Sequence, residues 1–86
     1  MIRDSHLKNA LYALNGVLIR ARAMAAMQAP YSDIAAVLDV AELLPMLIAN
    51  NRDETDWFRR VLEGLVQTHP GFDFVLQRFD GEDSLP

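Results

Sequence analysis

The first thirty residues carry more apolar positions than a single helix face requires. One stripe recurs at alternating steps of four and three residues: Leu7, Leu11, Leu14, Leu18, Ala21 and Ala25. A second stripe beside it consists of Ala10, Val17 and Met24, and a third, on roughly the other side, of Tyr12, Gly16, Ile19, Ala23 and Met27. A helix that is apolar nearly all round must be surrounded by its own fold or shared with another chain.

This pattern predicts a long helix that begins at Asp4 or Ser5, where either side chain can cap the free amides. It ends near Gln28, because a residue that precedes a proline, here Ala29 before Pro30, avoids the helical conformation. Gly16 lies in the middle of this helix and costs about 1 kcal/mol relative to alanine. We expect a close approach of another helix at this position to compensate.

A second helical pattern begins at Ser32, and its apolar positions share one face: Ile34, Val37, Leu38, Ala41 and Leu44. Pro45 then removes a backbone donor and clashes with the preceding turn. Either one kinked helix covers residues 33–50, or a short third helix begins with Pro45 in its first turn. We expect the break.

Two further patterns follow. The next helix begins between residues 51 and 53 and buries Phe58, Val61, Leu62, Leu65 and Val66; the last contains Phe72, Val75, Leu76 and Phe79. Residues 81–86 form a short C-terminal tail. The chain therefore predicts an all-α fold, a compact bundle of four to five helices with a long central N-terminal helix, as one domain over residues 1–86.

Composition adds a reason to expect self-association. Apolar residues make up 51% of 86 residues, so a chain this small has difficulty hiding them all. We expect a homodimer whose interface includes the third stripe (Tyr12, Gly16, Ile19, Ala23 and Met27), and Trp57 as an aromatic anchor. A different protein partner is the alternative, because both would use the same kind of apolar surface.

Charge and residue types exclude several other classes. Residues 1–30 hold four basic side chains against one acid, the remainder four against eleven, and the total is −4, which argues against nucleic acid. The segment 31–40 resembles the first helix of a helix-turn-helix DNA-binding unit through Ile34 and Ala35. However, Asp39 stands where that family has glycine, and residues 41–48 contain no Arg, Lys, Asn or Gln to read bases.

The sequence gives equally little support for catalysis, metal binding or membrane insertion. Asp4, Ser5 and His6 are adjacent, so their side chains diverge instead of converging as a triad. The chain has no cysteine, and neither histidine has a partner at ligand spacing. No apolar run approaches the ~20 residues that span a bilayer, and we see no secretory signal. We expect no cofactor, no bound metal and a cytoplasmic location.

The sequence thus favours a non-enzymatic protein-interaction or regulatory module that associates with itself through apolar helix faces. Small acidic inhibitors of the antitoxin or immunity type belong to this class, and the compact chain has a bacterial character. The alternative is a small-molecule binder with an apolar pocket in the bundle or at the dimer interface. That pocket would draw on Tyr12, Asn15, Arg22, Met24, Tyr31 and Met46.

Overall fold

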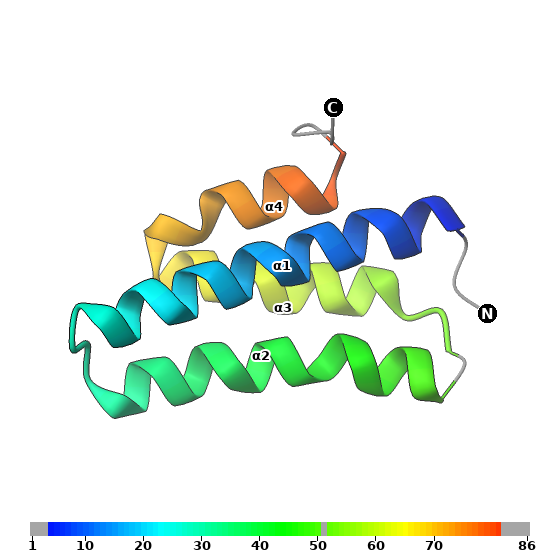
Figure 1. Cartoon of the computed structure of the whole chain (residues 1–86). Helices are drawn as coiled ribbons and strands as arrows, with labels where there is room; N and C mark the ends of the chain where they lie inside the picture. The colour runs from blue at the N-terminus through cyan, green and yellow to red at the C-terminus, as the bar shows by residue number, and fades with distance from the viewer. Residues whose placement is uncertain (1–3, 51, 82–86) are drawn as a thin grey trace.

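In the part of the chain that the structure describes, four α-helices run alternately up and down around one apolar core (Figure 1). The computed structural model describes residues 4–50 and 52–81. The elements are α1 (Asp4–Ala26), α2 (Tyr31–Ala49), α3 (Thr55–Thr68), the 3-10 turn η1 (Pro70–Phe72) and α4 (Asp73–Phe79). Within these ranges the chain has no strand. The predicted all-α bundle with a long first helix is therefore confirmed.

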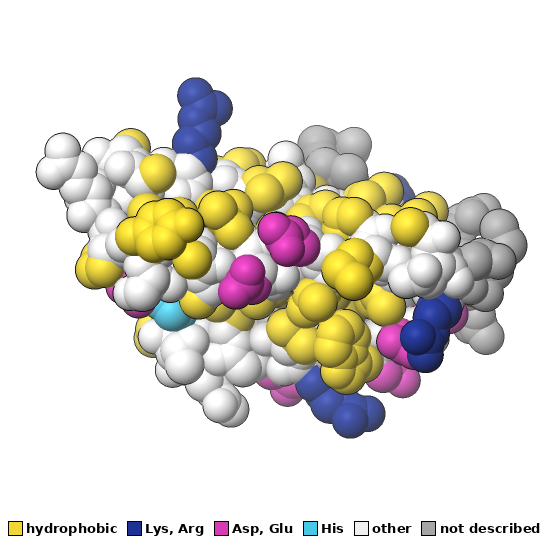
Figure 2. Space-filling view, turned by 90° about the horizontal axis from the view of Figure 1, so that it is seen from below, with side chains coloured by type: hydrophobic (Ala, Val, Ile, Leu, Met, Phe, Trp, Pro, Cys, Tyr) yellow, Lys and Arg dark blue, Asp and Glu magenta, His cyan; other side chains and the backbone are white. Residues whose placement is uncertain are grey.

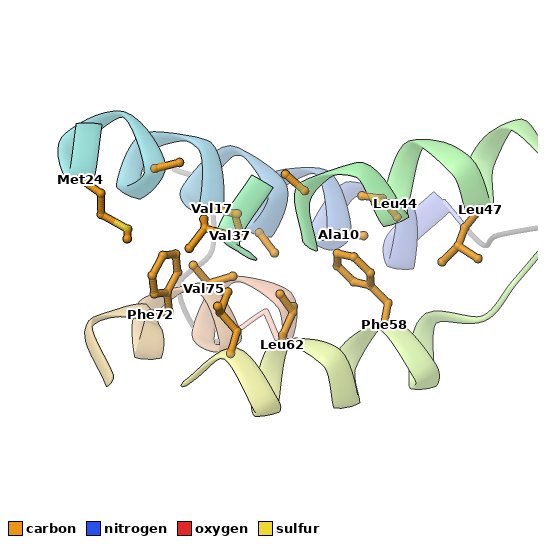
Figure 3. Close-up of a cluster of buried hydrophobic side chains, with 14 residues drawn as sticks. Ala10, Val17, Met24, Val37, Leu44, Leu47, Phe58, Leu62, Phe72 and Val75 are labelled. Carbon is orange, nitrogen blue, oxygen red and sulfur yellow. The ribbon is translucent and has the colours of Figure 1, made fainter. Parts of the chain in front are cut away.

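The core joins small side chains of α1 to large ones from the other helices (Figure 3). Ala10, Ala13 and Val17 are fully buried on α1, and Phe58 of α3 and Phe72 of η1 supply the largest buried side chains opposite. The second stripe of the sequence, not the leucine stripe, is thus the most deeply buried. Small residues on the central helix allow its neighbours to approach closely, so that interior packing reaches the usual density.

The end of α1 is closed by backbone hydrogen bonds instead of a side-chain cap. The amide of Ala29 donates to the carbonyl of Met24 (2.9 Å), and the amide of Gln28 donates to that of Ala25 (3.1 Å). This pair of bonds is a Schellman motif, which requires a left-handed residue at Gln28, and its φ is 58°. Ala29 packs against the core beside Met24. The turn is therefore well anchored although glycine, its preferred residue, is absent.

Two expectations about α2 were wrong. The helix begins at Tyr31 with Pro30 at its N-cap and no side-chain cap bond, so Ser32 lies in the first turn and is not the cap. The helix also continues through Pro45 to Ala49 without a break. Pro45 is exposed. On the solvent side of a helix that curves around a core the backbone hydrogen bonds are longer, so the one that proline removes costs less free energy there.

Helix α3 begins at Thr55, two residues after the latest start that the sequence predicted, residue 53. The Thr55 hydroxyl donates to the Asp53 carboxylate at 3.1 Å. Residue 51 and the predicted tail beyond Gly81 lie outside the described residues.

Helices α1 and α4 approach each other closely at Gly16. A Cβ atom built on Gly16 would lie 2.8 Å from the ring of Phe74, 3.2 Å from the Arg78 guanidinium and 3.3 Å from a methyl group of Val75. The helix that approaches Gly16, as the sequence predicted, therefore belongs to the same chain. Val75 is fully buried and has little freedom to move away.

We predict opposite effects for the same substitution at two helical glycines. Gly16→Ala forces α4 away from α1 and lowers the free energy of unfolding by about 1 kcal/mol or more. Gly64→Ala, where a Cβ meets nothing within 4 Å, raises it by about 1 kcal/mol through helix propensity. Urea unfolding measures both, and a Gly16→Ala variant as stable as Gly64→Ala contradicts the close contact.

A second pair tests the left-handed residue after α1. Gln28→Gly removes the steric cost of a positive φ, so it raises the free energy of unfolding by about 1 kcal/mol. Gln67→Gly is the matched control in α3, where the same change costs up to about 1 kcal/mol. Thermal unfolding followed by circular dichroism compares them. Equal destabilisation by both changes would show that Gln28 is an ordinary helical residue.

Candidate protein-interaction surface

An open apolar groove runs along the outer side of the seam between α1 and α2. Its volume is about 490 Å³, and it is lined by Leu18, Leu38, Ala41, Glu42, Pro45 and Met46. Glu42 is the only charged residue among these six. Leu18 is 46% exposed and Met46 is 57% exposed, so the fold leaves large apolar side chains in contact with water. Such a patch on a small protein is typical of an interaction site.

Exposed apolar side chains continue beyond the groove because both helices repeat apolar residues every seven positions. On α1, Leu11 lies seven residues before Leu18 and is also nearly half exposed; on α2, Tyr31 lies seven before Leu38. Seven residues are almost two helical turns, so these side chains follow the same edge of each helix. Seen from the α2 side, hydrophobic side chains extend along much of the face and acidic ones interrupt them near the middle (Figure 2).

The third stripe of α1, which the sequence placed at the interface, is divided by the structure. Gly16 is buried beneath α4, and Tyr12 is half-buried: the Arg78 guanidinium lies 4.2 Å from the centre of the Tyr12 ring and donates to the Tyr12 carbonyl. Ala23 is half-buried. Ile19 and Met27 are exposed, at 53% and 66%. Trp57 is 43% exposed on α3, so these residues do not form one continuous face.

The residues of the alternative ligand pocket are also dispersed. Met46 lines the groove, while Met24 belongs to the core and Tyr31 is 84% exposed at the start of α2. Asn15 accepts a hydrogen bond from Arg78 at 3.2 Å, and Arg22 is exposed. Neither the groove nor the second cavity described next contains more than one of the six.

A polar cavity of about 280 Å³ lies where the beginnings of α1 and α3 meet the end of α4. It is lined by His6, Asn9, Thr55, Asp56, Arg59, Phe79 and Asp80. Arg59 donates to both carboxylate oxygens of Asp80, at 2.9 and 2.8 Å, and pairs with Glu63 at 3.0 Å. This ion pair joins α3 to the C-terminal end of α4, and its side chains remain partly exposed.

The contact between Arg59 and Asp80 shifts the pKa values of both groups away from their ordinary values. The hydrogen bond from Arg59, more than its charge, holds the pKa of the Asp80 carboxyl below its usual value. The same hydrogen bond raises the pKa of Arg59. Arg59 is therefore engaged in a structural contact and is not available as a base. The pairing of Arg59 with Glu63 follows from their spacing of four residues, but nothing local in the sequence points to Asp80.

The described residues offer no other recognisable chemistry. They contain no group of three His, Asp or Glu side chains placed to hold a metal ion. Over the same ranges, no helix is long and apolar enough to cross a bilayer. The helix-turn-helix resemblance is also not supported, because α2 continues without a turn past Asp39. No family model, no curated protein and no solved structure matches this chain.

We predict a stability loss at neutral pH when the bidentate pair is removed. Asp80→Asn lowers the free energy of unfolding by about 1 kcal/mol at pH 7, a modest value because the pair is partly exposed. A lowered folded-state pKa means that this contribution is present above about pH 3.9, the unfolded value, and is lost as the pH falls through the folded value.

The difference between wild type and Asp80→Asn should therefore shrink below about pH 4. Asp39→Asn, the same change at an exposed position of α2, serves as control and should have little effect at either pH. Urea unfolding at pH 7 and pH 3 measures both variants. A difference that stays constant over this range would exclude an ionised Asp80 as the source of the effect.

Proposed function

We propose that this protein is a non-enzymatic interaction module that associates with itself through the apolar groove between α1 and α2. The observation that supports this most directly is the exposure of Leu11, Leu18, Leu38 and Met46 along one seam. These side chains lie outside the buried core, and covering their exposed parts stabilises an interface by about 25 cal/mol per Å² of apolar area. A cytoplasmic location fits such a role and stays a prediction.

A protein surface suits the groove better than a small ligand does. A typical small-molecule pocket encloses most of its ligand and places a few convergent polar groups inside. Here the apolar side chains are spread along two helices, in steps of seven residues, and only Glu42 brings a charge. A helical surface with its own apolar stripe matches this length and spacing.

The test compares two neighbouring residues of α1 whose side chains point about 100° apart around the helix. Leu18→Glu puts a charge into the groove and should convert a dimer into a monomer in light scattering over a hundredfold range of concentration. Ile19→Glu makes the same change at a residue of similar exposure outside the groove and should leave the dimer intact. Circular dichroism verifies that both variants are folded.

Either of two outcomes would contradict the proposal. A wild-type monomer at every concentration would show that the groove does not serve self-association. A dimer that Ile19→Glu breaks and Leu18→Glu leaves intact would move the interface to the side of α1 that carries the third stripe, as the sequence alone suggested.

A further inference from the structure

The two helices that border the groove carry opposite charges. Along α1 the exposed charged side chains next to the apolar stripe are cationic: Lys8 and Arg22. Helix α2 contains no lysine or arginine, and Asp39 and Glu42 are its exposed acidic residues. Asp33 lies elsewhere, 3.9 Å from Nε2 of His69. Arg20 of α1 lies against Gly71 instead of the groove. The groove therefore has one basic edge and one acidic edge.

Both edges border the apolar seam closely. Arg22 follows Leu18 by four residues, so it lies one turn further along the same side of α1. Glu42 lies between Leu38 and Met46 at steps of four residues, and all three line the groove. Any partner that covers the leucines thus meets a cation on one side and an anion on the other. A partner with charges of one sign would be attracted by one edge of the groove and repelled by the other.

We propose that the partner is a second copy, docked about a two-fold axis parallel to the helices so that α1 of each copy covers α2 of the other. This inference rests on the proposed self-association and adds its geometry. A two-fold axis makes the interface self-complementary. With the axis along the helices, each basic edge faces an acidic edge and each apolar stripe faces another. With the axis perpendicular to the helices, α1 faces α1 and α2 faces α2, which puts like charges together.

The level of the residues along the helices agrees with this arrangement. Arg22 lies four residues before the end of α1 and Glu42 lies eleven residues after the start of α2. On antiparallel helices these two residues therefore differ in height by about seven residues, or ~10 Å. Asp39, eight residues after the start of α2, differs from Arg22 by about four residues, or ~6 Å. An axis parallel to the helices keeps every height unchanged, so Arg22 lies about one turn from Asp39 of the partner subunit and about two turns from Glu42 of the partner subunit.

Charge reversal tests the orientation separately from self-association. Arg22→Glu and Glu42→Arg should each raise the dimer dissociation constant about threefold or more at low salt, because each adds a like charge to both contacts between a basic and an acidic edge. The double variant Arg22→Glu/Glu42→Arg should restore the wild-type constant. Arg60→Glu, an exposed position on α3, is the matched control and should change it little. Sedimentation equilibrium gives the constants.

Mixing the two single variants should also produce a heterodimer in preference to either homodimer, since Arg22→Glu leaves acidic residues at both positions 22 and 42 and Glu42→Arg leaves basic residues at both. If Glu42→Arg strengthens the dimer, α2 faces α2, and the proposed orientation is wrong while the groove still serves self-association. If neither single variant changes a dimer that Leu18→Glu breaks, the edges do not meet and the orientation is equally wrong. If the wild type is a monomer, the proposed function itself fails.

Discussion

The close packing of α1 against its neighbours is the constraint on which the rest of the structure depends. Its inward side is made of small residues, with Gly16 against α4 and Ala10 and Ala13 fully buried. A helix with so little bulk cannot fill a core by itself, so Phe58 and Phe72 enter from α3 and η1. The alanines of α1 therefore face the core, and leucines of α1 such as Leu11 and Leu18 lie at the edge of the bundle.

This arrangement explains which parts of the fold follow from the sequence. The apolar repeats predicted the helices and the deeply buried Phe58, Leu62, Phe72 and Val75, because those positions are set by local periodicity. The repeats did not predict which stripe of α1 would be innermost. That choice depends on the volume that opposing side chains occupy, and this is decided only when helices far apart in sequence come together.

The sequence predicted exposed apolar surface on α1, and the structure distributes it differently over the helix. An excess of apolar surface on α1 was correctly read from the sequence, yet Gly16 and Tyr12 are covered by α4 of the same chain and Leu18 is not. The seven-residue spacing of Tyr31, Leu38 and Pro45 was the available signal for the second wall of the groove. It was obscured by the expectation that Pro45 breaks the helix. The Arg59–Asp80 pair joins residues that are 21 positions apart, and the helical spacing of residues along the sequence cannot predict a contact over that separation.

Pro45 also has a consequence for the local stability of α2. Because proline has no amide hydrogen, the carbonyl of Ala41 receives no bond from the residue four positions later, and the ladder of helical bonds is interrupted there. The final turn is held by the burial of Leu44 and Leu47 and by hydrogen bonds beyond the proline, such as that from the Asn50 amide to the Met46 carbonyl at 3.0 Å. Local opening of this end of α2 costs less than opening of the half before Pro45. The wall of the groove that carries Met46 is therefore the more adaptable one, and it can adjust its shape to whatever surface it meets.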